Sequence, residues 1–230
     1  MLFYQPSEGY CYNSDTVFLY DFARRFIKKG SVVDIGAGCG VLGFLLANTL
    51  PIELTSIELQ EDVFRLCEKN AQINNIECKL VNSDFLEFDT QDRYDFFVSN
   101  PPFYHSTTLK GSSQNLALSR HCSALPFKAM LKKINSMIKP KGEFVFCYEA
   151  RSIGDVLKSL NEYNFKVSNL KFIHPKASKE ATIFLCRAKK SGNPQLVVEP
   201  PLVVFDADSN YTQDIAELFR LDTHTIKCKL

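Results

Sequence analysis

The chain has 230 residues, of which 45% are apolar, and it carries a formal net charge of +1. A chain of this length and composition can bury a substantial core, so we expect one domain over 1–230, with a helical extension at 1–30, a core at 31–190 and a C-terminal extension at 191–230 that packs on it. No apolar run approaches the roughly 18 residues of a membrane span, and the N-terminus lacks the basic-then-apolar order of a signal peptide. We therefore expect a cytoplasmic protein.

The cysteines and the distribution of charge exclude few classes of protein. Eight cysteines are scattered without a CxxC pair or a neighbouring histidine pattern, so we expect reduced, mostly buried thiols and no metal. Basic residues gather at 24–29, 132–141 and 171–190, whereas acidic residues concentrate between 53 and 95. Each basic cluster is either a solvated face or part of a surface for a polyanion, and the charge pattern leaves both interpretations open.

In chain order, the first predicted helix begins at Ser14 or Asp15, which can cap it, and continues to about Lys28, where Gly30 ends it. The pattern then predicts a strand and glycine loop at 31–40, a helix at 41–50, a strand at 52–59, a helix at 61–75, and strands at 78–84 and 94–100. Strands that alternate with helices in this way indicate a parallel sheet covered on both faces.

The second half continues the alternation and then breaks it. It predicts a helix at 123–138, a strand at 142–149, a helix at 152–164, and strands at 165–173 and 180–189. Because no helix separates the last two strands, we expect them to form an antiparallel hairpin at one sheet edge. The predicted fold is therefore α/β, with a mostly parallel seven-stranded sheet. The proline-rich tail from Gly192 precedes a short helix.

A glycine-rich stretch, VVDIGAGCG at 32–40, lies where a predicted strand turns into a helix. Gly36, Gly38 and Gly40 let the backbone approach a ligand there, and the following helix presents free amides to it. The stretch also satisfies the dinucleotide pattern GxGxxG through Gly38, Gly40 and Gly43. The glycines alone therefore predict a cradled ligand without identifying it.

Three acidic residues lie at the ends of the predicted strands. Asp34 precedes the glycines, where a carboxylate repels a pyrophosphate but can orient a zwitterionic amino acid or a water. Glu58 suits the two hydroxyls of a ribose, and Asp84 is positioned for an adenine amino group, with Phe85 beside it for the ring. An acidic residue that binds the ribose hydroxyls fits NAD as well, but Asp34 together with Asp84 fits S-adenosylmethionine better. The alternative is that these acids only cap the helices and turns that follow.

The stretch SNPPFYHS at 99–106 places two adjacent prolines after an apolar strand, where neither strand nor helix can continue. It should lie at the same carboxyl edge as the glycine loop, where parallel sheets bind ligands. There the Asn100 side-chain oxygen and the Pro101 carbonyl can accept both hydrogens of an exocyclic amine, which turns its lone pair toward a methyl group. Phe103 or Tyr104 can stack on the base, so catalysis is mostly positioning.

Asn-Pro-Pro-aromatic after DxGxGxG resembles the amino-methyltransferases of the class I S-adenosylmethionine-dependent fold. The resemblance implies a Rossmann-like sheet, S-adenosyl-L-methionine as the cofactor and S-adenosyl-L-homocysteine as the product. That class includes adenine-N6 and guanine-N2 methyltransferases of DNA and RNA, and glutamine methyltransferases of protein release factors.

Three longer stretches resemble one subfamily. They are similar to blocks of the bacterial tRNA1(Val) (adenine-N6)-methyltransferases, and they read QPSEGYCYNSDTVFLYDF, HPKASKEATIFL and EPPLVVFDADSNYTQDI. This resemblance implies methylation of the adenine immediately 3′ of the anticodon. Cys11 departs from the pattern, which usually has an arginine there. By this resemblance the catalytic motif is Asn100, Pro101, Pro102 and Phe103, and the cofactor positions are Asp34, Gly36, Gly38, Gly40, Glu58 and Asp84.

Other acceptors stay open: an rRNA guanine, a DNA adenine or a release-factor glutamine. A release-factor enzyme normally carries a separate helical domain, whereas only about 30 residues precede the core here. A non-catalytic binding module or a nicotinamide oxidoreductase leaves the NPPF stretch without a purpose. We expect tRNA as the partner, held by the core's own surface. The candidate contacts are Tyr104, Arg120, His121, Lys171, Lys176 and Lys179.

Overall fold

The computed structural model describes residues 1–7, 11–101, 125–221 and 223–229. Five residues predicted for the catalytic motif or for substrate binding lie outside the described residues, namely Pro102, Phe103, Tyr104, Arg120 and His121. Within the described ranges, no helix combines the length and the apolar character needed to cross a lipid bilayer.

Strands and helices alternate through the middle of the chain, as the apolar periodicity predicts. The helices are α1 (Ser14–Arg24), α2 (Val41–Thr49), α3 (Glu61–Ile73), α5 (Phe127–Met137), α6 (Ile153–Glu162) and α7 (Gln213–Leu218), with a short 3₁₀ turn η1 (Ala150–Ser152). The strands are β1 (Leu2–Pro6), β2 (Gly30–Ile35), β3 (Ile52–Glu58), β4 (Cys78–Asn82), β5 (Tyr94–Ser99), β6 (Ile138–Glu149), β7 (Phe165–Lys176), β8 (Ile183–Lys190), β9 (Val197–Val198), β10 (Leu202–Phe205) and β11 (His224–Cys228).

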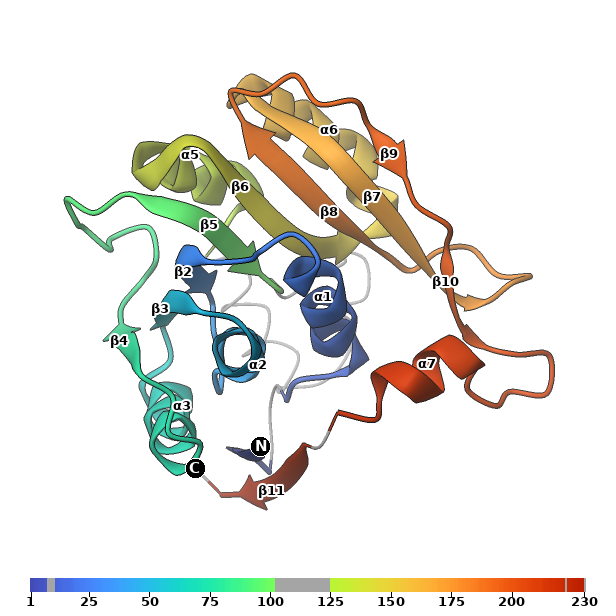
Figure 1. Ribbon diagram of the computed structural model, residues 1–230, viewed down its shortest axis with the longest axis horizontal. Coiled ribbons are helices and arrows are strands. Elements are labelled where there is room, and N and C mark those ends of the chain that lie inside the picture. The colour runs from blue at the N-terminus through green and yellow to red at the C-terminus, as the bar shows by residue number, and fades with distance from the viewer. Residues whose placement is uncertain (8–10, 102–124, 222, 230) are drawn as a thin grey trace, which may run out of the picture.

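The main sheet confirms the expected α/β fold. Among the described residues it has nine strands in the order β10-β7-β8-β6-β5-β2-β3-β4, with β9 also paired to β7 (Figure 1). The strands from β6 to β4 in this order pair in parallel, and β8 runs antiparallel to both β6 and β7. Seven of the nine strands correspond to the predicted ones. The other two, β9 and β10, come from the C-terminal extension and pair with the outer edge of β7.

Successive strand residues face two different apolar cores. In β2, Val32 belongs to the core under α1 and α2, whereas Val33 belongs to the core under α5 and α6. Val98 and Phe97 of β5 divide in the same way. Figure 1 shows α1 and α2 on one side of the sheet and α5 and α6 on the other. The alternation of strand side chains therefore produces the three layers.

The first helix differs from its prediction at both ends. Its N-cap is Asn13 rather than Ser14 or Asp15, because the Asn13 side chain accepts a hydrogen bond from the Asp15 amide at 3.1 Å. The helix ends at Arg24 rather than near Lys28. The glycine at position 30 does not end the helix but begins β2 with φ of +111°, where an added Cβ atom would lie 2.7 Å from a carboxylate oxygen of Asp95.

The two chain ends meet beside the main sheet. β1 pairs in parallel with β11, with Leu2 opposite His224, so the two termini lie close together in Figure 1. Between β10 and β11 the chain contacts α1 through aromatic rings: Tyr211 lies edge-on to Phe219, which stacks on Phe18 at 6.1 Å. The C-terminal extension therefore packs on α1 and also extends the sheet.

Candidate active site

The glycine loop joins β2 to α2, and its three predicted glycines have left-handed backbone. The φ angle is +67° at Gly36, +58° at Gly38 and +85° at Gly40, a region that favours glycine. A Cβ atom at Gly36 or Gly38 would meet nothing within 4 Å, whereas one at Gly40 would lie 2.3 Å from the Phe44 ring. Gly36 and Gly38 therefore border open space that a ligand can enter, and Gly40 is required for packing against α2.

Glu58 ends β3 and binds the backbone of the glycine loop. Its Oε2 accepts a hydrogen bond from the Gly38 amide and its Oε1 accepts one from the Gln60 amide, both at 2.8 Å. Only 6% of Glu58 is exposed. One carboxylate therefore fixes the loop and the start of α3 together. Because a carboxylate has about four acceptor positions, Glu58 can also receive the hydroxyls of a ribose.

Asp34 lies behind the loop and is almost fully buried, with 1% exposed. Its Oδ2 accepts a hydrogen bond from the amide of Gly43, in the first turn of α2, at 2.9 Å. Burial raises the pKa of Asp34 to about 7, although the Gly43 hydrogen bond opposes the rise and the charge of Glu58 adds to it. Asp34 therefore titrates near neutral pH and holds the helix that follows the glycine loop. Its predicted contact with a cofactor stays a prediction.

Asp84 and Phe85 follow β4 and open a turn. The Asp84 Oδ1 accepts a hydrogen bond from the Leu86 amide at 2.8 Å, and its carbonyl accepts one from the Phe88 amide at 2.9 Å. Asp84 thus has the capping contact that the sequence left as an alternative, and it stays partly exposed. Phe85 is 4% exposed and lies edge-on to Phe97 with the ring centres 6.4 Å apart. The structure places Phe85 in the core, and its role beside an adenine ring stays a prediction.

Asn100 directly follows β5, and its side chain is held from two sides. Its Nδ2 donates to the hydroxyl oxygen of Thr16 in α1 at 3.0 Å, and its Oδ1 accepts from the thiol of Cys147 in β6 at 2.7 Å. Asn100 is half-buried, and Pro101 is buried. The carboxamide predicted to bind an amine is therefore oriented by the fold around it.

The sheet brings these groups to one edge. β5, β2, β3 and β4 are successive parallel neighbours, so their carboxyl ends point the same way. The Ser99 hydroxyl donates to the carbonyl of Ile35, and the Ala37 amide donates to the carbonyl of Ile57, both at 2.9 Å. These bonds tie the Asn100 loop, the glycine loop and the end of β3 together. Parallel sheets bind ligands at such an edge.

Two of the predicted basic contacts, Lys176 and Lys179, lie at the same edge of the sheet, at the end of β7 and in the turn after it, whereas Lys171 lies within β7. β7 is parallel to β6 and ends at Lys176, so the turn to β8 leaves at the carboxyl edge. The Lys176 ammonium donates to the Ser209 hydroxyl at 2.7 Å and to the Ala207 carbonyl at 3.2 Å, so it binds the C-terminal extension. Lys179 is exposed, and its carbonyl oxygen lies 2.8 Å from Nδ1 of His174.

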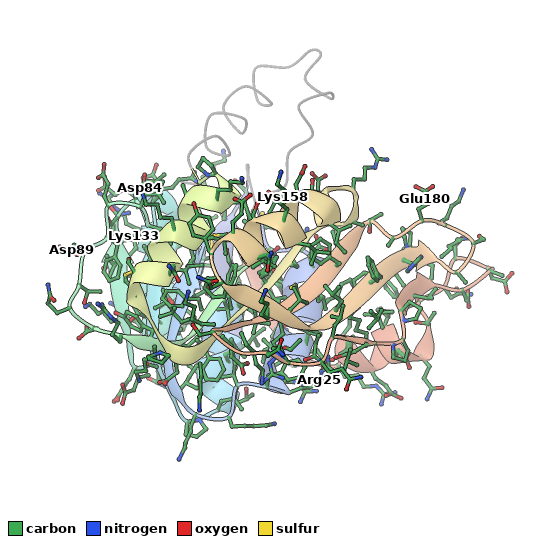
Figure 2. The ribbon with its side chains drawn as sticks, turned by 90° about the horizontal axis from the view of Figure 1, so that it is seen from above. Arg25, Asp84, Asp89, Lys133, Lys158 and Glu180 are labelled. Atoms are coloured by element: carbon green, nitrogen blue, oxygen red, sulfur yellow. The ribbon has the colours of Figure 1, made fainter. Side chains whose placement is uncertain are left out.

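Figure 2 places Arg25 away from the candidate site. It shows Asp84, Lys158 and Glu180 along one side of the molecule and Arg25 on the opposite side. Arg25 is also paired with Glu199 at 2.8 Å. Arg25 therefore lies away from the side of the molecule on which Asp84 marks the candidate site.

Two buried amides support the site and were missed by the sequence reasoning. Asn70 of α3 is fully buried; its Oδ1 accepts from the Tyr4 amide at 2.7 Å, and its Nδ2 donates to the Tyr4 and Cys39 carbonyls, each at 2.9 Å. Gln5 of β1 accepts from the Tyr12 amide at 2.9 Å. The sequence contains one signal for such a role, because Asn70 is a polar residue on the apolar face of a helix.

Cys11, where the resembling subfamily usually has an arginine, has a cation beside it. The ammonium of Lys227 in β11 lies 2.7 Å from the Cys11 sulfur, and that sulfur lies 3.2 Å from the Pro6 carbonyl oxygen. The C-terminal strand thus supplies a positive charge at this position.

The described residues hold no group of three or more His, Cys, Asp and Glu side chains that fits a metal ion. The sheet order, the open glycine loop and the polar strand ends define a Rossmann-like methyltransferase domain. The chain belongs to the methyltransferase small domain family, which matches residues 13–147.

Curated relatives extend the match over most of the chain. A protein from Shewanella baltica named tRNA1(Val) (adenine(37)-N6)-methyltransferase is 26% identical over 92% of this chain and 91% of its own length. One of the same name from Dyadobacter fermentans is 26% identical over 77% of this chain and 75% of its own.

Solved structures share the fold. A protein from Agrobacterium tumefaciens, described as a "predicted O-methyltransferase", superposes with a TM-score of 0.69 at 15% identity, over 93% of this chain and 100% of its own. A 16S rRNA N2 methyltransferase from T. thermophilus, solved with AdoMet and guanosine, gives a TM-score of 0.56 at 18% identity, over 80% of this chain and 44% of its own.

Proposed function

We propose that this chain transfers a methyl group from S-adenosylmethionine to N6 of an adenine in tRNA, the adenine immediately 3′ of the anticodon in tRNA1(Val). The observation that carries the proposal is the position of Asn100 and Pro101 on the same sheet edge as the glycine loop. The names of the curated relatives, the first of which spans nearly the whole chain, support the choice of acceptor. A tRNA acceptor implies a reaction in the cytoplasm.

The glycine loop and Glu58 fit the cofactor. The space beside Gly36 and Gly38 is open, and Glu58 is a nearby carboxylate able to bind ribose hydroxyls. Asp84, which is partly exposed, is assigned to the adenine amino group. When bound, S-adenosylmethionine supplies an electrophilic methyl group on a sulfonium. NAD fits less well, because Asp34, buried behind the loop, repels a pyrophosphate whenever it is ionised.

Asn100 and Pro101 act on the acceptor. The N6 amine of adenine is a weak nucleophile because its lone pair is delocalised into the ring. When the Asn100 Oδ1 and the Pro101 carbonyl accept its two hydrogens, the lone pair is directed out of the ring plane. Phe103 and Tyr104, which lie outside the described residues, are assigned to stacking on the base. The chain thus contributes a fixed acceptor geometry rather than covalent catalysis.

A basic edge is assigned to the RNA. Lys179 is exposed at the turn between β7 and β8, at the carboxyl edge that also carries Asn100. Arg120 and His121 are assigned to the same surface by their closeness in sequence to the NPPF stretch. Phosphate contacts of this kind make RNA affinity depend steeply on salt.

The test is methyl transfer from labelled cofactor to four acceptors: a tRNA1(Val) transcript, the same transcript with guanine 3′ of the anticodon, duplex DNA and a release factor. We expect transfer to the first alone, with N6-methyladenosine found by mass spectrometry. Asn100→Ala should lose transfer while S-adenosylhomocysteine still stabilises the chain in a thermal shift assay, because the amine contact belongs to the transition state. Transfer to the release factor or to DNA instead of tRNA would overturn the assignment, as would stabilisation by NAD alone.

A further inference from the structure

The Asn100 carboxamide is held by two buried side chains that lie far from it in sequence. Thr16 is in α1, 84 residues earlier, and Cys147 is in β6, 47 residues later. Thr16 is 4% exposed and Cys147 is fully buried. Thr16 lies in the stretch at 5–22 that resembles the subfamily, but neither residue belongs to the glycine loop or to the NPPF stretch, which predict the site.

The two contacts select one of the two orientations of the carboxamide. The oxygen and the NH₂ group of an asparagine have nearly the same shape, so the surrounding hydrogen bonds decide which end lies where. A threonine hydroxyl can donate or accept and therefore tolerates both orientations. A cysteine thiol donates its proton and accepts only weakly, so it favours the amide oxygen. Burial raises the pKa of the Cys147 thiol well above its ordinary value, which keeps this proton in place at neutral pH.

We propose that Thr16 and Cys147 are positioning residues that hold the Asn100 carboxamide with its oxygen oriented to receive the acceptor amine. This inference rests on the proposed function, because it concerns how Asn100 binds that amine. An amide oxygen has two lone pairs, so it can accept the thiol and one N–H of the amine together. In the turned orientation the NH₂ group would face the N–H donors of the amine, and the hydrogen bond that exposes the nitrogen lone pair would be lost.

The contact itself can be tested without any substrate, through the S–H stretching band of Cys147 in Raman spectra. Cys147→Ala assigns the band by its loss, and a hydrogen-bonded S–H vibrates at lower frequency than a free one. We expect the Cys147 band to move to higher frequency in Asn100→Ala. The control is Lys158→Ala, an exposed change on α6 that should leave the band unchanged. A band that does not move in Asn100→Ala would overturn the proposal.

The role of the contact is tested by kinetics on the tRNA transcript. Thr16→Val and Cys147→Ala should each lower kcat about 3- to 10-fold, the effect of losing one neutral hydrogen bond, with the Kd for S-adenosylhomocysteine unchanged. Thr16→Ser and Cys147→Ser keep a hydroxyl at each position and should restore kcat to within about 2-fold of the wild type. The matched control is Cys186→Ala, which removes a fully buried thiol from β8 in the other core and should leave kcat unchanged.

The outcomes separate the two proposals. If the wild-type chain methylates tRNA and the alanine and valine variants keep the wild-type kcat, the positioning role is wrong and the proposed function stands. An equal loss in the serine variants would also overturn it, because a general packing defect would then explain the effect. If the wild-type chain transfers nothing to tRNA while the Raman band responds to Asn100→Ala, the acceptor assignment is wrong and the contact stands.

Discussion

Replacing the buried carboxylate behind the glycine loop should change how stability depends on pH. Asp34→Asn keeps an amide oxygen that can accept the hydrogen bond of the Gly43 amide, now 2.9 Å from Oδ2, but it removes the titrating proton. The substitution therefore removes the ionisation of the Asp34 carboxyl but keeps its hydrogen bond with the Gly43 amide. Because Asp34 is 1% exposed, its ionised form has almost no contact with water.

The sign and size of the effect follow from the raised pKa. Burial raises the pKa of Asp34 from 3.8 to about 7, so the folded chain binds this proton more tightly than the unfolded chain does. The free energy of unfolding that depends on Asp34 therefore falls as the pH rises from about 4 to about 7, and it is not regained above that range. Between pH 5 and pH 8 the loss comes to about 2.5 kcal/mol.

The assay is urea unfolding of both proteins at pH 5 and pH 8. We expect the stability difference between the wild type and Asp34→Asn to shift against the wild type by about 2.5 kcal/mol between the two pH values. Asp95→Asn is the control. Burial raises the pKa of Asp95, but hydrogen bonds from Lys139 and Ser31 outweigh it and lower the pKa overall. The contribution of Asp95 to the free energy of unfolding is thus nearly complete by about pH 5 and should be equal at both pH values. Parallel pH profiles of the wild type and Asp34→Asn would refute the reasoning.

Three further outcomes are expected. Gly38→Ala should fold, with a small loss of melting temperature from its positive φ, and should weaken S-adenosylhomocysteine binding at least about 10-fold by calorimetry. Gly40→Ala should lower the melting temperature more, because its Cβ in addition meets a ring at 2.3 Å. Asn70→Ala should cost about 2 to 4 kcal/mol in urea unfolding, since it removes the partner of the buried Cys39 carbonyl and of the partly buried Tyr4 amide and carbonyl, and a wild-type midpoint would contradict this. Lys179→Glu should raise the RNA concentration for half-maximal rate at low salt without changing stability. Lys176→Glu should lower thermal stability as well, because its ammonium binds the Ser209 hydroxyl.

The order of strands and helices in the core is predictable because each element carries its own periodic pattern. The predicted strand at 52–59 is β3 (Ile52–Glu58), and the predicted helix at 61–75 is α3 (Glu61–Ile73). Helix α3 buries one face, whereas β3 is a short run that is buried on both faces over residues 54–58. Both patterns are properties of the local sequence. The parallel sheet then follows from the alternation of the two element types.

The terminal strands were not predicted, for a physical reason. β1, β9, β10 and β11 have two to five residues each, and unlike the equally short β4 they lie outside the alternating strands and helices between β2 and β8. Each forms by pairing with a segment that is not its neighbour in the chain, as when Leu2 lies opposite His224. Their stability therefore comes from tertiary pairing, which a local window of sequence does not contain.

The candidate site also contains residues that the sequence predicts and residues that it does not predict. The residue types at the strand ends identify Glu58 and Asn100, because loops at one edge of a parallel sheet converge. The hydrogen bonds that hold Asn100 were not predictable, since Thr16 and Cys147 approach it only after packing. By sequence Cys147 is one more apolar position in a buried strand, next to Phe146. Motif reasoning thus predicts candidate reacting groups and misses the side chains that hold them.

The C-terminal extension contacts α1, the helix that carries Thr16. The family match begins at residue 13 and ends at 147, so the C-terminal extension lies outside it. That extension nevertheless reaches α1, where Phe219 stacks on Phe18 with the ring centres 6.1 Å apart, a contact worth about 0.5 to 1.5 kcal/mol beyond its buried area. Phe18 lies two residues after Thr16, whose hydroxyl accepts the hydrogen bond from Asn100 at 3.0 Å. The glycine loop is held separately, by the carboxylate of Glu58. The C-terminal extension therefore stabilises the helix whose Thr16 holds the Asn100 side chain, while the glycine loop depends on contacts within the core.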